Sequence, residues 1–179
     1  QNTMRDAIVA GLTLNIFNKH SDRVRMANIA QTVNVLQSVA LTDGADMLLT
    51  PTYYVFKMYK DHQNNTLLGS YLTSKEYEAD HRLYPQLLES ASMDENGVIT
   101  ATVVNTSETE SAAFKTQIAD YAVKSVKAEI LTGASHAYNS FETKDSVKTR
   151  SFDAFTVSGD GFETEIPACS VVKFTVSHE

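Results

Sequence analysis

The apolar residues of this chain follow a helical period at its start and a strand period at its end, and this change constrains the fold more than any other feature. Residues 5–20 repeat apolar side chains at helical spacing, and a second helix is predicted after Thr50, with Pro51 in its first turn. Residues 24–30 are a short, largely apolar run that contains Asn28, which is typical of a strand covered on both faces. Helix, buried strand and helix together indicate part of a parallel sheet or barrel.

One buried strand and two helices cannot cover themselves, because a parallel strand needs a neighbour on each side to satisfy its backbone. We therefore expect the missing neighbours to come from preceding sequence or from another chain. The first helix also begins almost at the first residue, which predicts a chain that starts inside a larger fold. Between the strand and the second helix, Asp43 and Gly44 predict a hairpin turn.

From about residue 84 onward the pattern becomes one of short alternating segments. Strands are predicted over residues 98–104 and from Ala113, Val123 and Cys169 onward. Turn-forming residues separate these segments, as in an antiparallel sandwich. The predicted division is an α/β part over residues 1–63, a polar connector over residues 64–84 and a β-sandwich over residues 85–179.

Composition excludes several classes of partner. The formal net charge is -7 and the calculated pI is 5.2, so we expect neither a nucleic-acid partner nor an anionic membrane partner, since both need a clustered basic surface. The apolar runs are far shorter than the roughly 20 residues of a membrane span. Cys169 is the single cysteine, which excludes an intrachain disulfide and favours a reducing, cytoplasmic environment.

The sequence contains no familiar catalytic or metal-binding motif. Its five histidines are scattered, and no HExxH, GxSxG or glycine-rich phosphate motif occurs, so we expect neither a metal nor a cofactor. Two pairs of carboxylates share a face of a predicted element. Glu163 and Glu165 share one face of a strand, and Glu76 and Asp80 would share one face of a helix if that segment were helical. Both pairs lie in polar stretches, which favours exposed, solvated carboxylates over acid–base chemistry.

Three amide side chains lie at the end of the predicted buried strand: Asn28, Gln31 and Asn34. If residues 24–30 form a barrel strand, Gln31 follows its carboxyl end, where such barrels place their binding residues. The alternative is that these amides tie down a loop backbone, because buried amides are usually paired within the protein. The residue pattern alone leaves both interpretations open.

Two stretches, "MANIAQTVNVLQ" and "LTPTYYVFKMYKDHQ", resemble the last part of the catalytic barrel of glycoside hydrolase family 51, the α-L-arabinofuranosidases. The second half of the chain is similar to the C-terminal sandwich of that family, with "ITATVVNTS", "AEILTG", "NSFETKDSVKTR" and "IPACSVVKFTV" in the expected order. The segment after "NSFET" departs from the family, which usually has a proline-containing acidic segment where Lys144 and Asp145 stand here. The resemblance covers nearly the whole chain.

This resemblance implies a mixed fold: the last helix, strand and helix of a (β/α)8 TIM barrel, followed by an antiparallel, jelly-roll-like β-sandwich. It implies a retaining hydrolase that releases terminal α-L-arabinofuranosyl residues from arabinan, arabinoxylan or oligosaccharides, using two carboxyl groups about 5 Å apart. The family places both glutamates in motifs around "NE" and "EW", and neither motif occurs here. We therefore expect no catalytic residue in this chain and no activity from the chain alone.

The same resemblance makes Gln31 the expected substrate-binding residue, because it matches the glutamine of the family motif "NIAQ". Other implied partners are the remainder of the barrel and further copies of the enzyme in a homo-oligomer. The alternative function is a non-catalytic sandwich that binds carbohydrate or supports assembly. Its candidate aromatic residues are Tyr121, Tyr138 and Phe141, although core packing is the commoner role of aromatic side chains.

Overall fold

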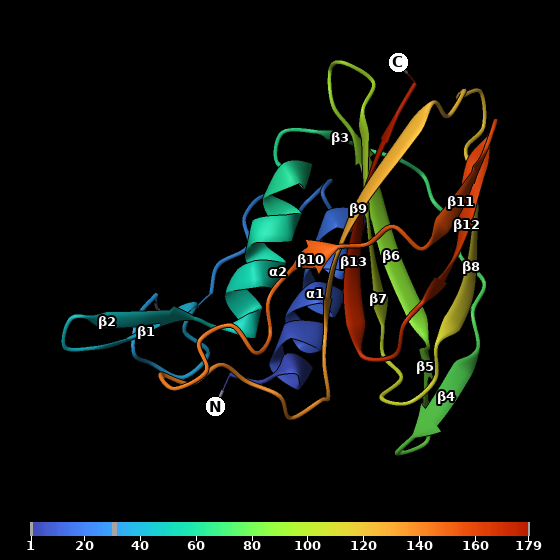
Figure 1. Ribbon diagram of the computed structural model, residues 1–179. Helices are drawn as coiled ribbons and strands as arrows, with labels where there is room; N and C mark the ends of the chain where they lie inside the picture. The colour runs from blue at the N-terminus through green and yellow to red at the C-terminus, as the bar shows by residue number, and fades with distance from the viewer. Residues whose placement is uncertain (1, 30–31, 179) are drawn as a thin grey trace.

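The computed structural model describes residues 2–29 and 32–178, which form three layers: a pair of helices, a larger sheet and a smaller sheet (Figure 1). The helix pair is α1 (Met4–Lys19) and α2 (Pro51–Tyr59), and a 3-10 turn η1 (Lys60–His62) follows α2. Within the described residues, the larger sheet has six strands in the order β10-β9-β13-β7-β6-β3, and the smaller sheet has three in the order β11-β12-β8.

All the strand pairs in these sheets are antiparallel. The strands of the larger sheet are β3 (Thr66–Leu67), β6 (Leu87–Met93), β7 (Ile99–Asn105), β9 (Ser125–Thr132), β10 (Arg150–Ser151) and β13 (Ser170–Ser177). Those of the smaller sheet are β8 (Ala112–Gln117), β11 (Phe155–Ser158) and β12 (Gly161–Ile166). The predicted antiparallel sheets are confirmed, and the jelly-roll connectivity stays a prediction.

Both predicted helices are confirmed, and local signals fix their starts. The backbone N–H of Thr3 donates to the carboxylate of Asp6 at 2.7 Å, which anchors the first turn of α1. Thr50 caps α2, because its hydroxyl oxygen accepts from the backbone N–H of Tyr53 at 3.3 Å, and Pro51 occupies the first helical position. No helix in residues 2–29 and 32–178 has both the length and the apolarity that a membrane span requires.

The larger sheet is covered on both faces. Val104 and Val171 pack against the two helices, whereas their chain neighbours Val103 and Val172 pack toward the smaller sheet. Successive side chains of a strand point to opposite faces, so the two central strands bury residues on both faces: β7 buries six of its seven residues and β13 five of its eight. One hydrophobic core therefore lies between helices and sheet, and a second lies between the two sheets.

Gly11 sets how closely α1 approaches the sheet. A Cβ atom at Gly11 would lie 3.0 Å from a methyl group of Val104 and 3.3 Å from one of Val171. Such contacts are tighter than ordinary van der Waals packing, so the absence of a side chain lets the helix lie directly on β7 and β13. The helix axis is therefore held close to the sheet at this point.

The predicted strand over residues 24–30 is wrong for residues 24–29, which have no regular secondary structure; Ala30 lies outside the described residues. Met26 is 74% exposed and Asn28 is also exposed, so the expected burial on both faces is wrong as well. The physical reason is that a strand needs a neighbouring strand to satisfy its backbone, as we expected from the sequence. Within the described part of the chain no strand lies beside this segment to pair with its backbone.

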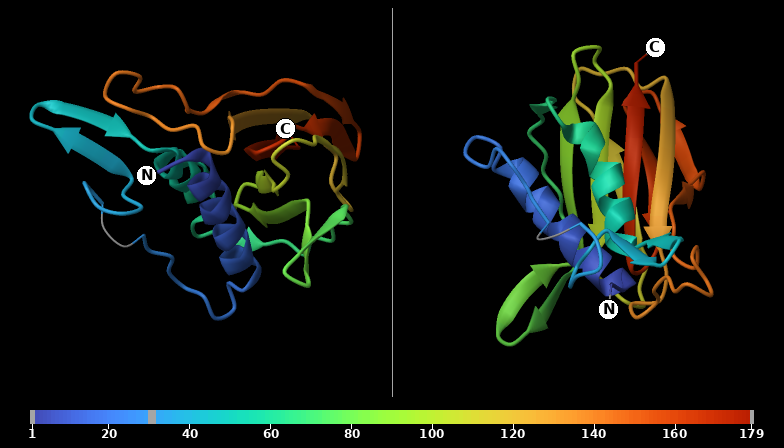
Figure 2. Two further views of the ribbon diagram at one scale, coloured as in Figure 1. Left: turned by 90° about the horizontal axis from the view of Figure 1, so that it is seen from below. Right: turned by 90° about the vertical axis from the view of Figure 1, so that its left-hand side faces the viewer.

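Two hairpins extend from the three layers at separate places (Figure 2). The hairpin of β1 (Ala40–Asp43) and β2 (Asp46–Leu49) has its turn at Gly44, as predicted. The second hairpin, β4 (Glu76–Ala79) and β5 (Arg82–Pro85), lies in the predicted connector, so this segment is not helical. The division of the chain at residues 63 and 84 stays a prediction.

Candidate functional site

Gln31, the predicted substrate-binding residue, lies outside the described residues. The segment that follows it is held against the β1–β2 hairpin. The carbonyl of Thr32 accepts from the backbone N–H of Val39 at 3.2 Å and from that of Ala40 at 3.1 Å. Asn34 accepts from the N–H of Thr42 at 2.7 Å and donates to its hydroxyl at 2.9 Å. At Asn34 the amide thus ties down a loop, which is the structural alternative that the sequence left open.

A cavity of about 370 Å³ lies beside this segment, and we refer to it as the loop cavity. Residues 34–37 line one part of it, and residues 138–142 of the sandwich line another. Its lining combines apolar side chains, amides and hydroxyl groups, together with a single carboxylate, that of Glu142. None of its described lining residues is Lys, Arg or His, so nothing in it favours an anionic ligand.

Hydrogen bonds fix both sides of the loop cavity to the start of α1. The first helical N–H groups, which have no partner within a helix, donate to the sandwich loop: Met4 to the carbonyl of Ala137 and Arg5 to that of Ser135, each at 2.8 Å. On the other side, the amide nitrogen of Gln37 donates to the carboxylate of Asp6 at 2.8 Å. The start of α1 therefore places the two lining segments relative to each other.

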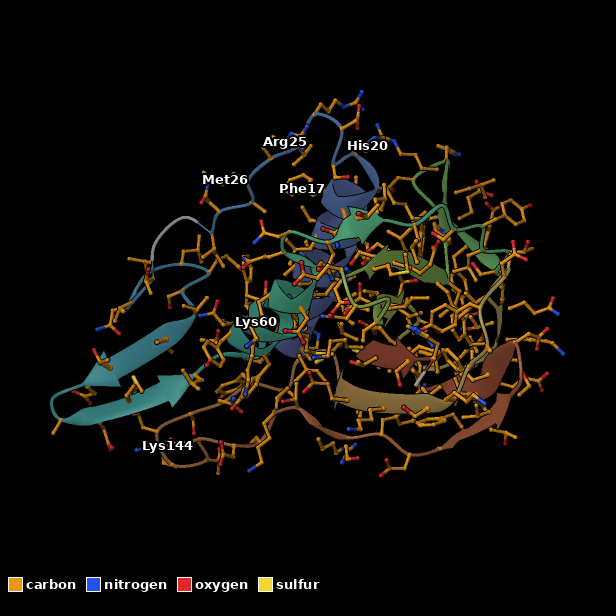
Figure 3. All side chains as sticks on the ribbon, turned by 90° about the horizontal axis from the view of Figure 1, so that it is seen from above. Phe17, His20, Arg25, Met26, Lys60 and Lys144 are labelled. Atoms are coloured by element: carbon orange, nitrogen blue, oxygen red, sulfur yellow. The ribbon has the colours of Figure 1, made fainter. Side chains whose placement is uncertain are left out.

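The sandwich loop is also fixed to the hairpin. Asn139 is 5% exposed, and its amide nitrogen donates to the carbonyls of Leu49 and Val147, each at 2.8 Å. Its amide oxygen accepts from the N–H of Val147 at 2.7 Å. Lys144 forms an ion pair with Asp46 on β2, close to the hairpin (Figure 3). Hydrogen bonds and an ion pair within the protein thus hold the segments that line the loop cavity in place.

A second cavity, of about 570 Å³, lies between the C-terminal ends of the two helices, and we refer to it as the helix-end cavity. Phe17 and Lys60 line it from the helix ends, and Arg25 and Met26 line it from the segment that leaves α1 (Figure 3). None of its described lining residues is Asp or Glu. Hydrolysis of a glycoside needs two carboxyl groups about the scissile bond, and neither cavity supplies such a pair.

A buried polar cluster joins the helices to the larger sheet. Asn15 on α1 is fully buried, and its amide oxygen accepts from the hydroxyl groups of Ser90 at 2.8 Å and Thr102 at 2.7 Å. Its amide nitrogen donates to the carbonyl of Leu88 at 2.9 Å. The Tyr59 hydroxyl lies 2.9 Å from the same amide oxygen and 3.0 Å from the carbonyl of Gly11. Burial raises the pKa of Tyr59 well above its usual value.

His62 continues this cluster at the end of α2. Because the Thr102 hydroxyl donates to Asn15, its oxygen accepts from Nε2–H of His62 at 3.0 Å, and Nδ1 then accepts from the Ser92 hydroxyl at 2.8 Å. Burial, helped by the Lys173 cation and opposed by Asp61, lowers the pKa of His62 to about 4. The ring is therefore neutral at physiological pH, and its two hydrogen bonds attach the end of α2 to strands β6 and β7.

The carboxylates singled out in the sequence lie on the surface. Glu163 and Glu165 are both exposed on β12, which confirms the prediction that these carboxylates lie on the surface. Glu163 forms an ion pair with Lys115 at 2.5 Å. Glu76 lies on β4 and Asp80 in the following turn, so they do not share a helical face. Among the described residues no group of three His, Cys, Asp or Glu side chains could hold a metal ion.

The aromatic residues proposed for carbohydrate binding separate into two groups. Tyr121 hydrogen-bonds the carbonyls of Gly97 at 2.8 Å and Val176 at 3.0 Å and packs edge-on against His178, so it serves packing. Tyr138 and Phe141 line the loop cavity. The structure brings these two beside the segment that follows Gln31, a proximity that no local sequence signal indicated.

The family model of the alpha-L-arabinofuranosidase C-terminal domain matches residues 1–170 of this chain. The chain belongs to this family. An intracellular exo-alpha-L-arabinofuranosidase from Bacteroides ovatus is 43% identical to this domain over 174 residues, which make up 96% of this chain and 34% of that protein. The resemblance to the α-L-arabinofuranosidases is thus confirmed.

Solved structures of glycoside hydrolase family 51 contain the same domain. The arabinofuranosidase from Xanthomonas axonopodis pv. citri superposes with a TM-score of 0.94 at 37% identity, over 99% of this chain and 36% of that chain. The α-L-arabinofuranosidase from Thermotoga maritima, solved as an arabinose complex, gives 0.86 at 25% identity, over 97% of this chain and 38% of that chain. The domain described here therefore spans about a third of the length of these relatives.

The buried polar cluster was missed in the sequence, although a signal for it existed. Asn15 falls on the buried face of α1, which also carries Gly11 and Leu14. An amide on such a face needs partners, and hydroxyl groups on a facing sheet can supply them. Ser90 and Thr102 lie on neighbouring strands β6 and β7 and are paired in register, so the three groups meet.

Proposed function

We propose that this domain is the C-terminal part of an α-L-arabinofuranosidase that removes terminal, non-reducing α-L-arabinofuranosyl residues from arabinan, arabinoxylan or arabino-oligosaccharides. The observation that carries the proposal is the family match over residues 1–170, together with 43% identity to a protein named as an exo-α-L-arabinofuranosidase. The proposed mechanism is retaining double displacement. One glutamate attacks the anomeric carbon and the other protonates the leaving oxygen.

We place both catalytic glutamates in the part of the enzyme that precedes this domain. The two cavities of the domain contain a single lining carboxylate among the described residues, that of Glu142, which cannot act alone in this mechanism. Gln31 is the proposed substrate contact from this domain. An amide both donates and accepts, so it can hydrogen-bond a furanose hydroxyl without adding charge near the nucleophile.

Residues 1–63 are proposed to complete a (β/α)8 barrel with the rest of the enzyme. Val9 and Ile16 are seven residues apart on the same outer face of α1 and are 57% and 47% exposed, and Met26 is 74% exposed. Exposed apolar side chains on a helix and the segment after it support contact with further protein. In such a barrel, neighbouring strands would supply the strand pairing that residues 24–29 lack within the described chain.

The test is hydrolysis of an aryl α-L-arabinofuranoside by the full-length enzyme and by the 179-residue chain alone. We expect turnover from the first and none above a buffer blank from the second. Replacing Gln31 with Ala in the full-length enzyme should lower kcat/KM by an amount worth about 1 to 3 kcal/mol of transition-state binding. Gln63→Ala, at an exposed glutamine, is the matched control. An unchanged kcat/KM for Gln31→Ala would return Gln31 to a structural role.

The second candidate function is carbohydrate binding or assembly by the sandwich without catalysis. The position of Tyr138 and Phe141 in the loop cavity favours it over a purely structural domain. Isothermal titration of the chain with arabino-oligosaccharides would separate the two, because binding without any turnover by the full-length protein supports the second. The proposed homo-oligomer is tested by light scattering of the full-length enzyme. A cytoplasmic location is also proposed, supported by the free, buried Cys169, and is tested by cell fractionation.

A further inference from the structure

The loop cavity has the chemistry of a site for a neutral sugar. Leu36 is 80% exposed and Tyr138 is 45% exposed, so both offer apolar surface to a ligand. The C–H face of a sugar packs on such surfaces, and aromatic side chains with a polar tip suit ligands that are apolar on one side and hydroxylated on the other. The absence of Lys, Arg and His among the described lining residues disfavours a phosphate or carboxylate ligand.

Polar groups in the cavity are positioned before any ligand binds. Gln37 is held by Asp6, and Asn34 is held by Thr42, so the two amides are fixed in orientation. Within residues 2–29 and 32–178, the hydroxyl of Tyr138 has no hydrogen-bond partner. A partly exposed phenol with an unused hydroxyl can both donate to and accept from a sugar hydroxyl.

The sequence links the cavity to the proposed substrate contact. Asn34, which lines the cavity, follows Gln31 by three positions in the chain. Gln31 is the proposed contact for the terminal arabinofuranosyl unit, so a later unit of the same oligosaccharide is the ligand that we assign to the cavity.

We propose that the loop cavity is a subsite for the leaving-group side of the substrate, occupied by a neutral pentose unit of an arabinose-containing chain. This inference rests on the proposed function, because a leaving-group side exists only if the full-length protein is a glycosidase. Leu36 and Tyr138 determine the preference for oligosaccharides over substrates that have no sugar in the leaving group. The sandwich thus contributes to substrate choice through a residue more than 100 positions from Gln31.

The experiment compares kcat/KM for an arabinofuranosyl trisaccharide with kcat/KM for an aryl α-L-arabinofuranoside in the full-length enzyme. Leu36→Ser and Tyr138→Ala should each lower the ratio of trisaccharide to aryl glycoside about tenfold. Leu36→Ser removes a largely exposed side chain, so it retains a folded enzyme even if Tyr138→Ala does not. Tyr71→Ala is the matched control, because Tyr71 is 94% exposed and lies outside the cavity.

The outcomes separate this inference from the proposed function. A ratio that stays constant in Leu36→Ser and Tyr138→Ala, in an enzyme that cleaves the aryl glycoside, would overturn the subsite and leave the proposed function intact. An equal fall for both substrates, with an unchanged ratio, would mean that the residues only support the fold. A wild-type enzyme that does not cleave the aryl glycoside would overturn the proposed function and the subsite together. A fall in the ratio for Tyr71→Ala equal to that of the two variants would also overturn the assignment.

Discussion

His62 makes the attachment of α2 to the larger sheet sensitive to acid. The buried ring has a pKa of about 4, whereas a histidine in an unfolded chain titrates near 6.5. Between these two values the unfolded chain binds a proton that the folded chain does not, so the free energy of unfolding falls as the pH falls. The stabilisation is present in full above about pH 6.5 and is lost progressively down to about pH 4.

The size of the effect follows from the two pKa values. Their difference corresponds to about 3 kcal/mol when the titration is complete, and to about 2 kcal/mol by pH 5. Losses of this size are a large fraction of the stability of an ordinary domain. Burial is the main cause of the lowered pKa of His62, and the charge of Asp61 raises that pKa whereas the charge of Lys173 lowers it.

The assay is urea unfolding of the chain between pH 7.5 and pH 5, followed by circular dichroism. The comparison is between wild type and His62→Gln, in which the amide still offers one donor and one acceptor to Ser92 and Thr102 but does not titrate. The stability advantage of wild type should shrink by about 2 kcal/mol over this range. His81→Gln is the control, since the His81 side chain is 99% exposed. A wild-type advantage that does not change with pH would refute the reasoning.

Two further predictions concern the same contact between helices and sheet. Asn15→Ala should lower the free energy of unfolding by about 3 kcal/mol, because it leaves buried hydroxyl groups of Ser90 and Thr102 without their acceptor; urea unfolding measures this, and a loss below about 1 kcal/mol would contradict it. Gly11→Leu should destabilise by about 1 to 3 kcal/mol through overpacking against β7 and β13, whereas Gly69→Leu, at a position with open space, should change the thermal midpoint little. Equal thermal midpoints for the two glycine variants would count against the packing argument.

Elements with local signals were predictable from the sequence. α2 carries its own start signal in Thr50 and Pro51, and the β1–β2 turn carries one in Gly44, so no distant contact is needed to recognise them. The central strands β7 and β13 were recognised from their apolar, β-branched residues. In each case the sequence itself contains the physical cause of the structure.

Elements that depend on distant partners were not predictable. Residues 24–29 have the composition of a buried strand, but a strand forms only beside a hydrogen-bonding neighbour. The β4–β5 hairpin escaped notice because its turn uses Asp80 and His81 at positive φ, without glycine, and because its strands are too exposed to alternate.

The candidate site was predictable only in part. The motif that contains Gln31 was recognised by family resemblance, and Gln31 itself lies outside the described residues. The loop cavity combines residues 34–37 with residues 138–142, which are about a hundred positions apart. Periodicity and turn chemistry act over a few residues, so they cannot reveal which distant loops meet.

The double coverage of β7 and β13 decides how this domain can be recombined with others. A graft that joined a foreign barrel to residues 64–178 would remove α1 and α2, and would leave Val104, Leu131 and Val171 without the side chains that now cover them. It would also leave the hydroxyl groups of Ser90 and Thr102 without their acceptor, the amide oxygen of Asn15. A chimaeric glycosidase built from this protein should therefore keep the helix pair and the sheet together as one transplantable unit, with the crossover placed before Thr3.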